Sequence, residues 1–108
     1  ESGGDQVDDL MYAGDAAAGI VAAACAPGAL SPLYNLSTGV GISLRDFAAG
    51  VAAAIPGADI EVGPGLEYMG PDFVYGVMDP VRARAELGFA AEPDPTVNAR
   101  RFAADSVA

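Results

Sequence analysis

The stretch "LYNLSTGVGISLRDF", Leu33 to Phe47, reads as a strand, then a glycine loop, then a helix. Ser43 is a good N-cap residue, and Asp46 falls in the first turn, where the helix dipole favours an anion. Apolar residues then recur at every third or fourth position until Pro56-Gly57. The pattern predicts a helix from Leu44 to about Ala54.

The loop between this strand and helix carries two glycines, Gly39 and Gly41, and we ask whether it holds a phosphate. A dinucleotide-binding fingerprint, G-x-G-x-x-G, needs a third small residue where Leu44 stands. It also needs an acidic residue at the end of the next strand, whereas Asp59 stands at the start of one. The sequence favours a tight turn with positive φ over a phosphate site.

Other segments alternate between short strands and helices. We expect a helix over 16–26 with Asp15 as its N-cap, a helix from Asp79-Pro80 to Gly88, and a last helix capped by Thr96. Short extended segments are predicted over 7–13, 32–37, 59–62 and 73–78. The fold class is therefore α/β, or an α+β small lobe, with about four helices in a single domain, 1–108.

The first helix is composed almost wholly of Ala, Gly, Ile and Val, without the polar stripe of a surface helix. We therefore expect it to be packed on several sides, with Gly19 allowing the close approach of a neighbouring element. Four helices and four short strands make a small core. Together with a start at Glu1 rather than Met, this predicts a piece of a larger body, either a processed chain or a fragment.

Charge and composition exclude several classes of partner. The chain carries 15 acidic residues and five Arg, so its net charge is −10, which disfavours binding to nucleic acid or to an anionic membrane surface. No apolar run reaches the length of a membrane span, and no signal peptide is recognisable at the N-terminus. The expected location is the cytoplasm.

The residue types also exclude much catalytic chemistry. Without His there is no Ser-His-Asp set and no His-bearing zinc site, and without Lys there is no Walker loop or Tyr-Lys proton relay. The lone cysteine, Cys25, forms no internal disulfide and is expected to be a small buried apolar residue rather than a nucleophile. Adjacent Asp8 and Asp9 point to opposite faces of an extended segment and do not act as a pair. We predict no catalytic residue and no metal site in this chain.

The segment "LEYMGPDFVY", Leu66 to Tyr75, is the candidate ligand contact. It is a long connection rich in aromatic and acidic side chains, of the kind that often carries function, although an ordinary surface loop has the same composition. The predicted substrate-binding residues are Tyr68, Met69, Asp72 and Tyr75.

Several motifs, in order along the chain, resemble the C-terminal part of NAD-dependent epimerase/dehydratase proteins, the extended short-chain dehydrogenases. They are "DDLMYAGDAAAGIVAAA", "LYNLSTGVGISLRDFAAGVAAAI", "DIEVGPG" and "DPVRARAELGFAAEPD". Typical members have a "DFVYVDD" segment, a "YNVGSG" strand and loop, a "SLREL" helix and a "D-x-x-x-A-x-x-x-LGW" helix. The resemblance covers nearly the whole chain.

The resemblance implies a parent enzyme of two lobes. A Rossmann lobe outside this sequence would bind NAD or NADP and supply a catalytic Tyr-x-x-x-Lys. This chain would be the substrate-binding lobe, with Leu33–Gly41 returning one strand to the Rossmann sheet, and would have no activity alone. Its partners would be that Rossmann lobe and a small-molecule substrate, whose hydroxyl-bearing carbon loses a hydride. The oligomeric state is left open.

Departures from the family pattern bear on the substrate. Members that act on nucleotide sugars place one Arg where Asp8 stands and another where Met69 stands, and both grip the diphosphate, while Asp72 is kept. Each lost clamp removes charge-assisted hydrogen bonds of roughly 1.5–3 kcal/mol. The substrate is therefore expected to differ from an ordinary nucleotide sugar; "LMYAGD" and "IPGADIEV" look like the L-threonine dehydrogenase branch.

A second reading comes from another functional class. The chain would be a standalone, non-catalytic binding or interaction domain that has kept this lobe and lost the enzyme. The apolar helix faces favour the enzyme lobe, because they need a partner surface. The reading frame upstream of Glu1 distinguishes the enzyme lobe from the standalone domain, because only the first needs an upstream Rossmann lobe.

Overall fold

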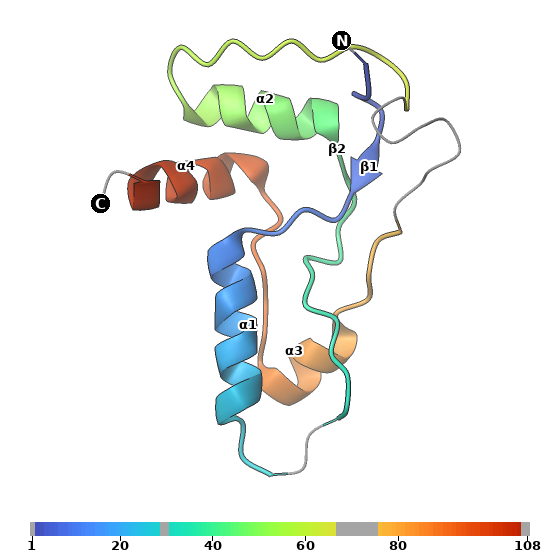
Figure 1. The fold of residues 1–108 in the computed structure, drawn as a ribbon, viewed down its shortest axis with the longest axis vertical. Helices are drawn as coiled ribbons and strands as arrows, with labels where there is room; N and C mark the ends of the chain where they lie inside the picture. Colours follow the sequence, from blue (N-terminus) through green and yellow to red (C-terminus); the bar gives the residue numbers. More distant parts are fainter. Residues whose placement is uncertain (1, 29–30, 67–75, 107–108) are drawn as a thin grey trace.

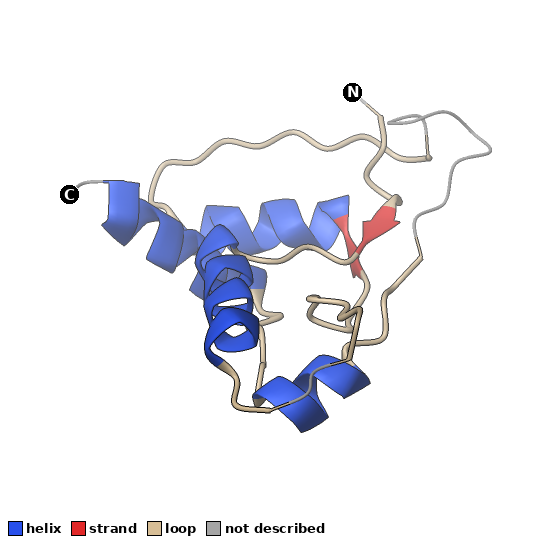
Figure 2. Ribbon diagram, turned by 60° about the horizontal axis from the view of Figure 1, so that its bottom comes forward, coloured by secondary structure: helices blue, strands red, loops and turns tan. Residues whose placement is uncertain are grey.

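The computed structural model describes residues 2–28, 31–66 and 76–106 of the chain. The elements within these residues are, in order, β1 (Val7–Asp8), α1 (Ala13–Cys25), β2 (Ile42–Ser43), α2 (Leu44–Ala54), α3 (Val81–Leu87) and α4 (Pro95–Ser106). Figure 2 shows how little of this part is strand. The class is mixed α/β with four helices, as the sequence predicted.

The elements form two arms. The upper arm holds α2, α4 and the small sheet, and the lower arm holds α1 and α3 (Figure 1). The chain measures 49 × 39 × 16 Å, and its radius of gyration is 15.8 Å. A compact domain of this length has a radius of gyration of about 13 Å. The molecule is therefore a thin slab in which few side chains are covered on all sides.

α2 begins and ends where the sequence predicted. Ser43 caps it, because its Oγ accepts a hydrogen bond from the Asp46 backbone N–H at 3.0 Å and donates to Asp46 Oδ2 at 2.8 Å. α2 packs on α4 through Gly50, where a Cβ atom would lie 2.6 Å from Pro95 Cγ. A glycine is thus needed where the two helices meet.

α1 begins earlier than expected, and Asp15 is not its N-cap. The helix starts at Ala13, Tyr12 is the capping residue without a side-chain cap bond, and Asp15 lies in the first turn. The Asp15 carboxylate instead accepts hydrogen bonds from Arg101, in α4, and from the backbone N–H of Glu92, in the connection that precedes α4. The prediction failed because a distant partner competes with the helix's own N–H groups for this carboxylate.

The expected close approach at Gly19 is confirmed. A Cβ atom there would lie 2.8 Å from Leu36 Cδ1 and 3.0 Å from Phe89 Cδ2. Phe89 is 5% exposed and, with Ala48 and Ala83, makes up the buried apolar core of the described residues. α1 is not packed on several sides within this chain, since Ile20 is 63% exposed and Gly19 is its one buried residue.

Strands are shorter and fewer than predicted. β1 and β2 pair antiparallel, with Val7 opposite Ser43 and Asp8 opposite Ile42. Segments 32–37 and 59–62 form no ladder with the described residues, and neither does 76–78, the half of the predicted segment 73–78 that the structure describes. A strand needs a neighbouring backbone edge, and residues 63–65 instead bond to the N-terminal turn at Gly3, Gly4 and Asp5.

The last two helices follow local rules. Asp79 Oδ1 accepts from the Val81 N–H at 2.9 Å at the start of α3, and Gly88 ends that helix with φ +65°, as predicted. α4 begins at Pro95, and Asp94 rather than Thr96 provides the cap, since Asp94 Oδ1 accepts from the Thr96 N–H at 2.8 Å. The expected Thr96 cap was therefore wrong by two residues.

Candidate functional site

The four predicted substrate-binding residues, Tyr68, Met69, Asp72 and Tyr75, lie in 67–75, outside the described residues. The structure does describe the chain on both sides of this segment, up to Leu66 and again from Gly76. The two flanks are each held by a carboxylate from the N-terminal segment.

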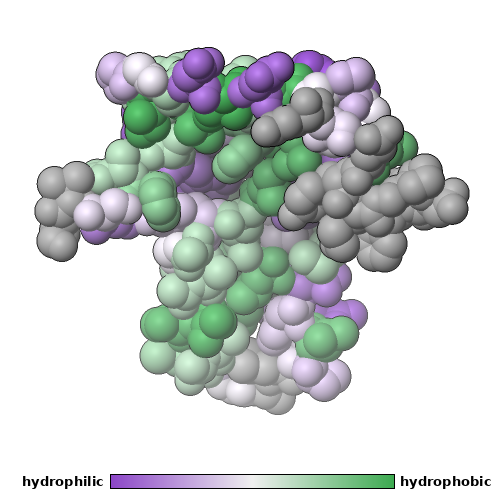
Figure 3. All heavy atoms as spheres, turned by 45° about the horizontal axis from the view of Figure 1, so that its top comes forward, coloured by the Kyte–Doolittle hydropathy of each residue, from purple (hydrophilic) through white to green (hydrophobic). Residues whose placement is uncertain are grey.

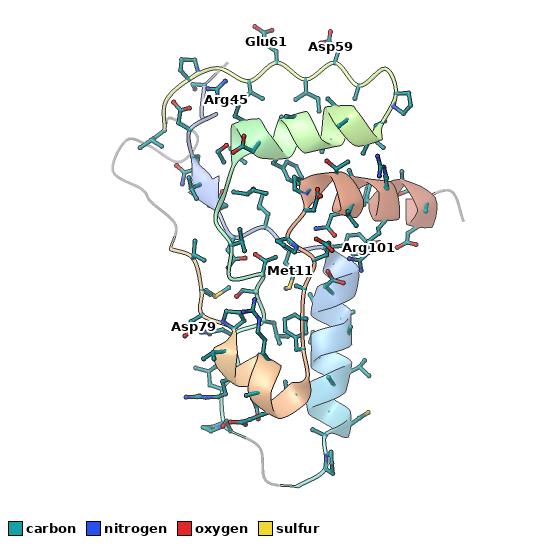
Figure 4. All side chains as sticks on the ribbon, turned by 180° about the vertical axis from the view of Figure 1, so that it is seen from behind. Met11, Arg45, Asp59, Glu61, Asp79 and Arg101 are labelled. Carbon is teal, nitrogen blue, oxygen red and sulfur yellow. The ribbon has the colours of Figure 1, made fainter. Side chains whose placement is uncertain are left out.

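Asp5 holds the flank that precedes the segment. Its Oδ2 accepts from the Gly65 N–H at 2.7 Å, and its own N–H donates to the Gly65 carbonyl at 3.2 Å. Arg45, from the first turn of α2, donates to Asp5 Oδ1 at 3.0 Å. The Gly65 N–H, followed by Arg45, lowers the pKa of the Asp5 carboxyl. The flank is thus tied to both the N-terminal turn and α2 (Figure 4).

Asp9 holds the flank that follows the segment. Its Oδ2 accepts from the Met78 N–H at 3.3 Å, and the Met78 carbonyl accepts from Ser37 Oγ at 3.2 Å. Asp9 also reaches the glycine loop, where Oδ1 accepts from the Thr38 N–H at 3.0 Å and from the Thr38 hydroxyl at 2.6 Å, and Oδ2 accepts from the Gly39 N–H at 3.3 Å. We call Asp9, Thr38, Gly39 and Met78 the polar joint.

This arrangement explains what the glycine loop does. Gly39 has φ +73°, the left-handed conformation expected of a tight turn. Gly41 lies where a Cβ atom would come within 2.8 Å of Val7 Cγ1 and 2.9 Å of Val77 Cγ2, so it permits a close approach. The loop N–H groups that would face a phosphate are bonded to Asp9. The loop therefore turns the chain, and its anion is a side chain of the protein itself.

A second polar cluster joins α1 to α4. Arg101 forms a two-pronged ion pair with Asp15, with distances of 2.5 and 2.9 Å, and its guanidinium lies 4.3 Å from the centre of the Tyr12 ring. The Tyr12 hydroxyl donates to Asp105. The Arg101 hydrogen bonds lower the pKa of Asp15, and the Asp105 carboxylate raises the pKa of Tyr12. Because each of these side chains has a partner within the cluster, we interpret the cluster as a structural contact between α1 and α4.

An apolar groove of about 580 Å³ lies between α2, α4 and the segment Leu10–Tyr12. Its wall is formed by aliphatic and aromatic side chains, with Asn98 as the one amide, and its members include Met11, Ile42, Phe47, Val51, Ile55 and Phe102. Phe102 is 65% exposed although it faces this groove. Figure 3 shows further apolar surface over the lower arm. Large apolar side chains are thus more often exposed than buried among the described residues.

Chemistry-bearing groups are sparse elsewhere. No set of acidic or cysteine side chains in residues 2–28, 31–66 and 76–106 is arranged to hold a metal ion. Cys25 is exposed at the end of α1, so its expected burial was wrong. In the same part of the chain, no helix combines the length and the apolar character needed to span a bilayer.

Comparisons with known proteins give one solved structure with the same fold. The chain is similar to the enzyme WbmF of Bordetella bronchiseptica, whose crystal structure was determined in complex with NAD+ and UDP. The TM-score is 0.60 and the sequences are 24% identical over 99% of this chain. The match spans 32% of the WbmF chain, so this chain has about a third of its neighbour's length. No family model and no curated protein matches the sequence.

Sequence reasoning missed the residues that position these segments. Asp9 was considered only as one of two adjacent acids, yet it bonds across 29 residues to Thr38 and 69 residues to Met78. Arg101 was not singled out at all, although its partner Asp15 is 86 residues away. Neither pairing leaves a periodic signal in a single sequence, because no local spacing relates the partners.

Proposed function

We propose that this chain is the substrate-binding lobe of an NAD(P)-dependent two-lobe enzyme acting at a hydroxyl-bearing carbon. The observation that carries the proposal is the fold, since nearly the whole chain follows one third of an enzyme crystallised with NAD+ and UDP. The order of the sequence motifs points the same way. By this proposal the reaction is a sugar epimerisation or dehydration, or the oxidation of a small alcohol, and the cofactor lies mainly on the other lobe.

The uncovered apolar surface supports a second lobe. Ile20, Val21 and Phe102 are each at least 60% exposed, while the core of the described residues holds only Ala48, Ala83 and Phe89. Monomeric proteins rarely expose contiguous apolar surface of this kind, and covering it contributes about 25 cal/mol per Å². A Rossmann lobe of the same polypeptide would cover these faces and enclose the segment 67–75.

The proposal is tested with the reading frame upstream of Glu1. We expect roughly 170–200 residues that carry a cofactor glycine motif and Tyr-x-x-x-Lys. Calorimetry should detect NAD+ binding to the longer polypeptide and none to the 108-residue chain. A start codon directly before Glu1, or NAD+ binding by this chain alone, would overturn the proposal and favour the standalone binding domain.

The pocket assignment has its own test in the longer polypeptide. Asp72→Asn and Tyr68→Phe should raise the KM for the substrate and leave the KM for the cofactor unchanged, because both residues are proposed to face the substrate only. Asp59→Asn is the matched control, since Asp59 is exposed and points away from α2 (Figure 4). An unchanged substrate KM in both variants would remove these residues from the pocket.

The substrate class follows from Asp8, which lies in β1, and from Met69. An acidic group beside a diphosphate repels it, so we propose a substrate without a nucleotide. UDP is the probe: the longer polypeptide should bind it weakly, and the double substitution Asp8→Arg with Met69→Arg should tighten binding by about tenfold or more, as expected for one or two new charge-assisted contacts. Tight UDP binding by the unmodified protein would restore the nucleotide-sugar reading.

A further inference from the structure

The polar joint has the geometry of an anion-binding site. Three backbone N–H groups, from Thr38, Gly39 and Met78, and the Thr38 hydroxyl all converge on the two oxygens of the Asp9 carboxylate. Backbone N–H groups arranged around a concavity in this way bind carboxylates and phosphates in many proteins. Here the anion comes from the chain itself.

The site is built rather than accidental. Thr38 is 2% exposed, and its hydroxyl accepts from the Val40 N–H at 3.0 Å. The hydroxyl proton has two acceptors within reach, Asp9 Oδ1 at 2.6 Å and the Val40 carbonyl at 3.1 Å, and the shorter contact is the one to Asp9. Arg84, from α3, donates to the Thr38 carbonyl at 2.8 Å from the other side. The ion pairs among the described residues are Arg45–Asp5 and Arg101–Asp15, so the charge on Asp9 is met there by neutral donors. Such donors are worth more to a carboxylate than to a neutral group.

We infer that Asp9 is the resident ligand of a backbone oxyanion cradle, and that this contact positions the chain after residue 75 against the glycine loop. Asp9 is a positioning residue, because its described partners are backbone N–H groups and one hydroxyl of this chain, which it holds together. The cradle should accept a small planar carboxylate when the Asp9 side chain is removed. The inference goes beyond the proposed function and depends on contacts within this chain alone.

The test is chemical rescue of the 108-residue chain. Asp9→Ala should lower the melting temperature by about 5–15 °C, as expected for the loss of several charge-assisted hydrogen bonds in a small domain. Sodium formate should restore roughly half of that loss or more, while sodium chloride at equal ionic strength restores none. Asp8→Ala is the matched control: it removes the same charge from the adjacent residue, and formate should leave it unchanged.

Amide signals in NMR spectra locate the rescue. In Asp9→Ala, formate should shift the Thr38, Gly39 and Met78 amide resonances saturably. The inference is overturned if sodium chloride restores the melting temperature as well as formate does, or if Asp9→Ala and Asp8→Ala lower it equally. It is also overturned if formate shifts only amide resonances outside the polar joint.

The unmodified chain provides a second measurement in case Asp9→Ala fails to fold. The Gly39 and Met78 amides lie outside helices and strands, and Asp9 is their acceptor in the described structure. The hydrogen exchange of these two backbone amides should be slow. Asp9→Asn should accelerate it, because the side-chain NH2 group that replaces one carboxylate oxygen cannot accept a hydrogen bond. Exchange as fast as that of an open loop residue would overturn the inference. Neither measurement uses cofactor or substrate, so a negative result here would leave the proposed enzyme function unaffected.

Discussion

The polar joint and the two helical arms differ in how far their side chains find partners within this chain. At the joint, four donors from two chain segments meet the carboxylate of a third segment, and the cradle is complete within this chain. On the arms, large apolar side chains such as Ile20 and Phe102 stay mostly exposed. The chain therefore sets its own geometry through directional polar contacts, while many of its large apolar side chains stay exposed.

The difference matters because the two kinds of interaction have different roles. Hydrogen bonds fix relative position but add little net stability, whereas apolar burial supplies most of the driving force for folding. A slab 16 Å thick offers little room for burial. We expect the isolated chain to hold its shape with a small free energy of unfolding, which substitutions in the two regions should lower by different amounts.

The largest effect is expected within the lower arm. Phe89→Ala removes the one large buried apolar side chain among the described residues and should cost about 3–5 kcal/mol of unfolding free energy, measured by urea denaturation. Ile20→Ala, on the exposed face of α1, should cost less than about 0.5 kcal/mol. Equal losses would show that the α1 face is covered in the isolated chain.

The next effect concerns the contact between α2 and α4. Gly50→Ala places a Cβ atom 2.6 Å from Pro95 Cγ and 3.1 Å from the Thr96 backbone nitrogen, so we expect a loss of about 1–3 kcal/mol. Glycine to alanine within an exposed helix usually stabilises, so the sign of the change is diagnostic. Gly76→Ala is the control, because a Cβ atom there meets nothing within 4 Å. A stabilised Gly50→Ala variant would mean that the two helices are further apart in solution.

The smallest effect is pH-dependent. Arg101 lowers the pKa of Asp15 in the folded chain, so this pair stabilises the fold above the ordinary carboxyl pKa and the contribution is lost as the pH falls through the lowered value. Asp15→Asn should lower the melting temperature by a few degrees at neutral pH, and the difference from the unmodified chain should shrink below about pH 4. Thermal scans across this range measure it.

Asp59→Asn is the control for that series, since Asp59 is exposed and makes no hydrogen bond to the described residues. It should change the melting temperature little at any pH. A difference for Asp15→Asn that grows on acidification would contradict the assigned ion pair.

The candidate site was predictable only in part. The sequence indicated that the Gly39 loop turns the chain, and its φ of +73° confirms this. The anion that fills the loop, Asp9, was not predicted, because its donors come from residues 29 and 69 positions away. The substrate residues at 68, 69, 72 and 75 stay a prediction, since they lie outside the described residues.

By itself, the sequence determined the features that depend on a few neighbouring residues. The bounds of α2, the Ser43 cap and the left-handed Gly88 all follow from local steric and hydrogen-bonding rules. Only the tertiary structure decided the role of Asp9, the diversion of Asp15 from cap to ion pair, and the fate of the predicted strands. Those outcomes depend on which distant groups meet, and a carboxylate or a strand edge takes whichever partner the fold brings within reach.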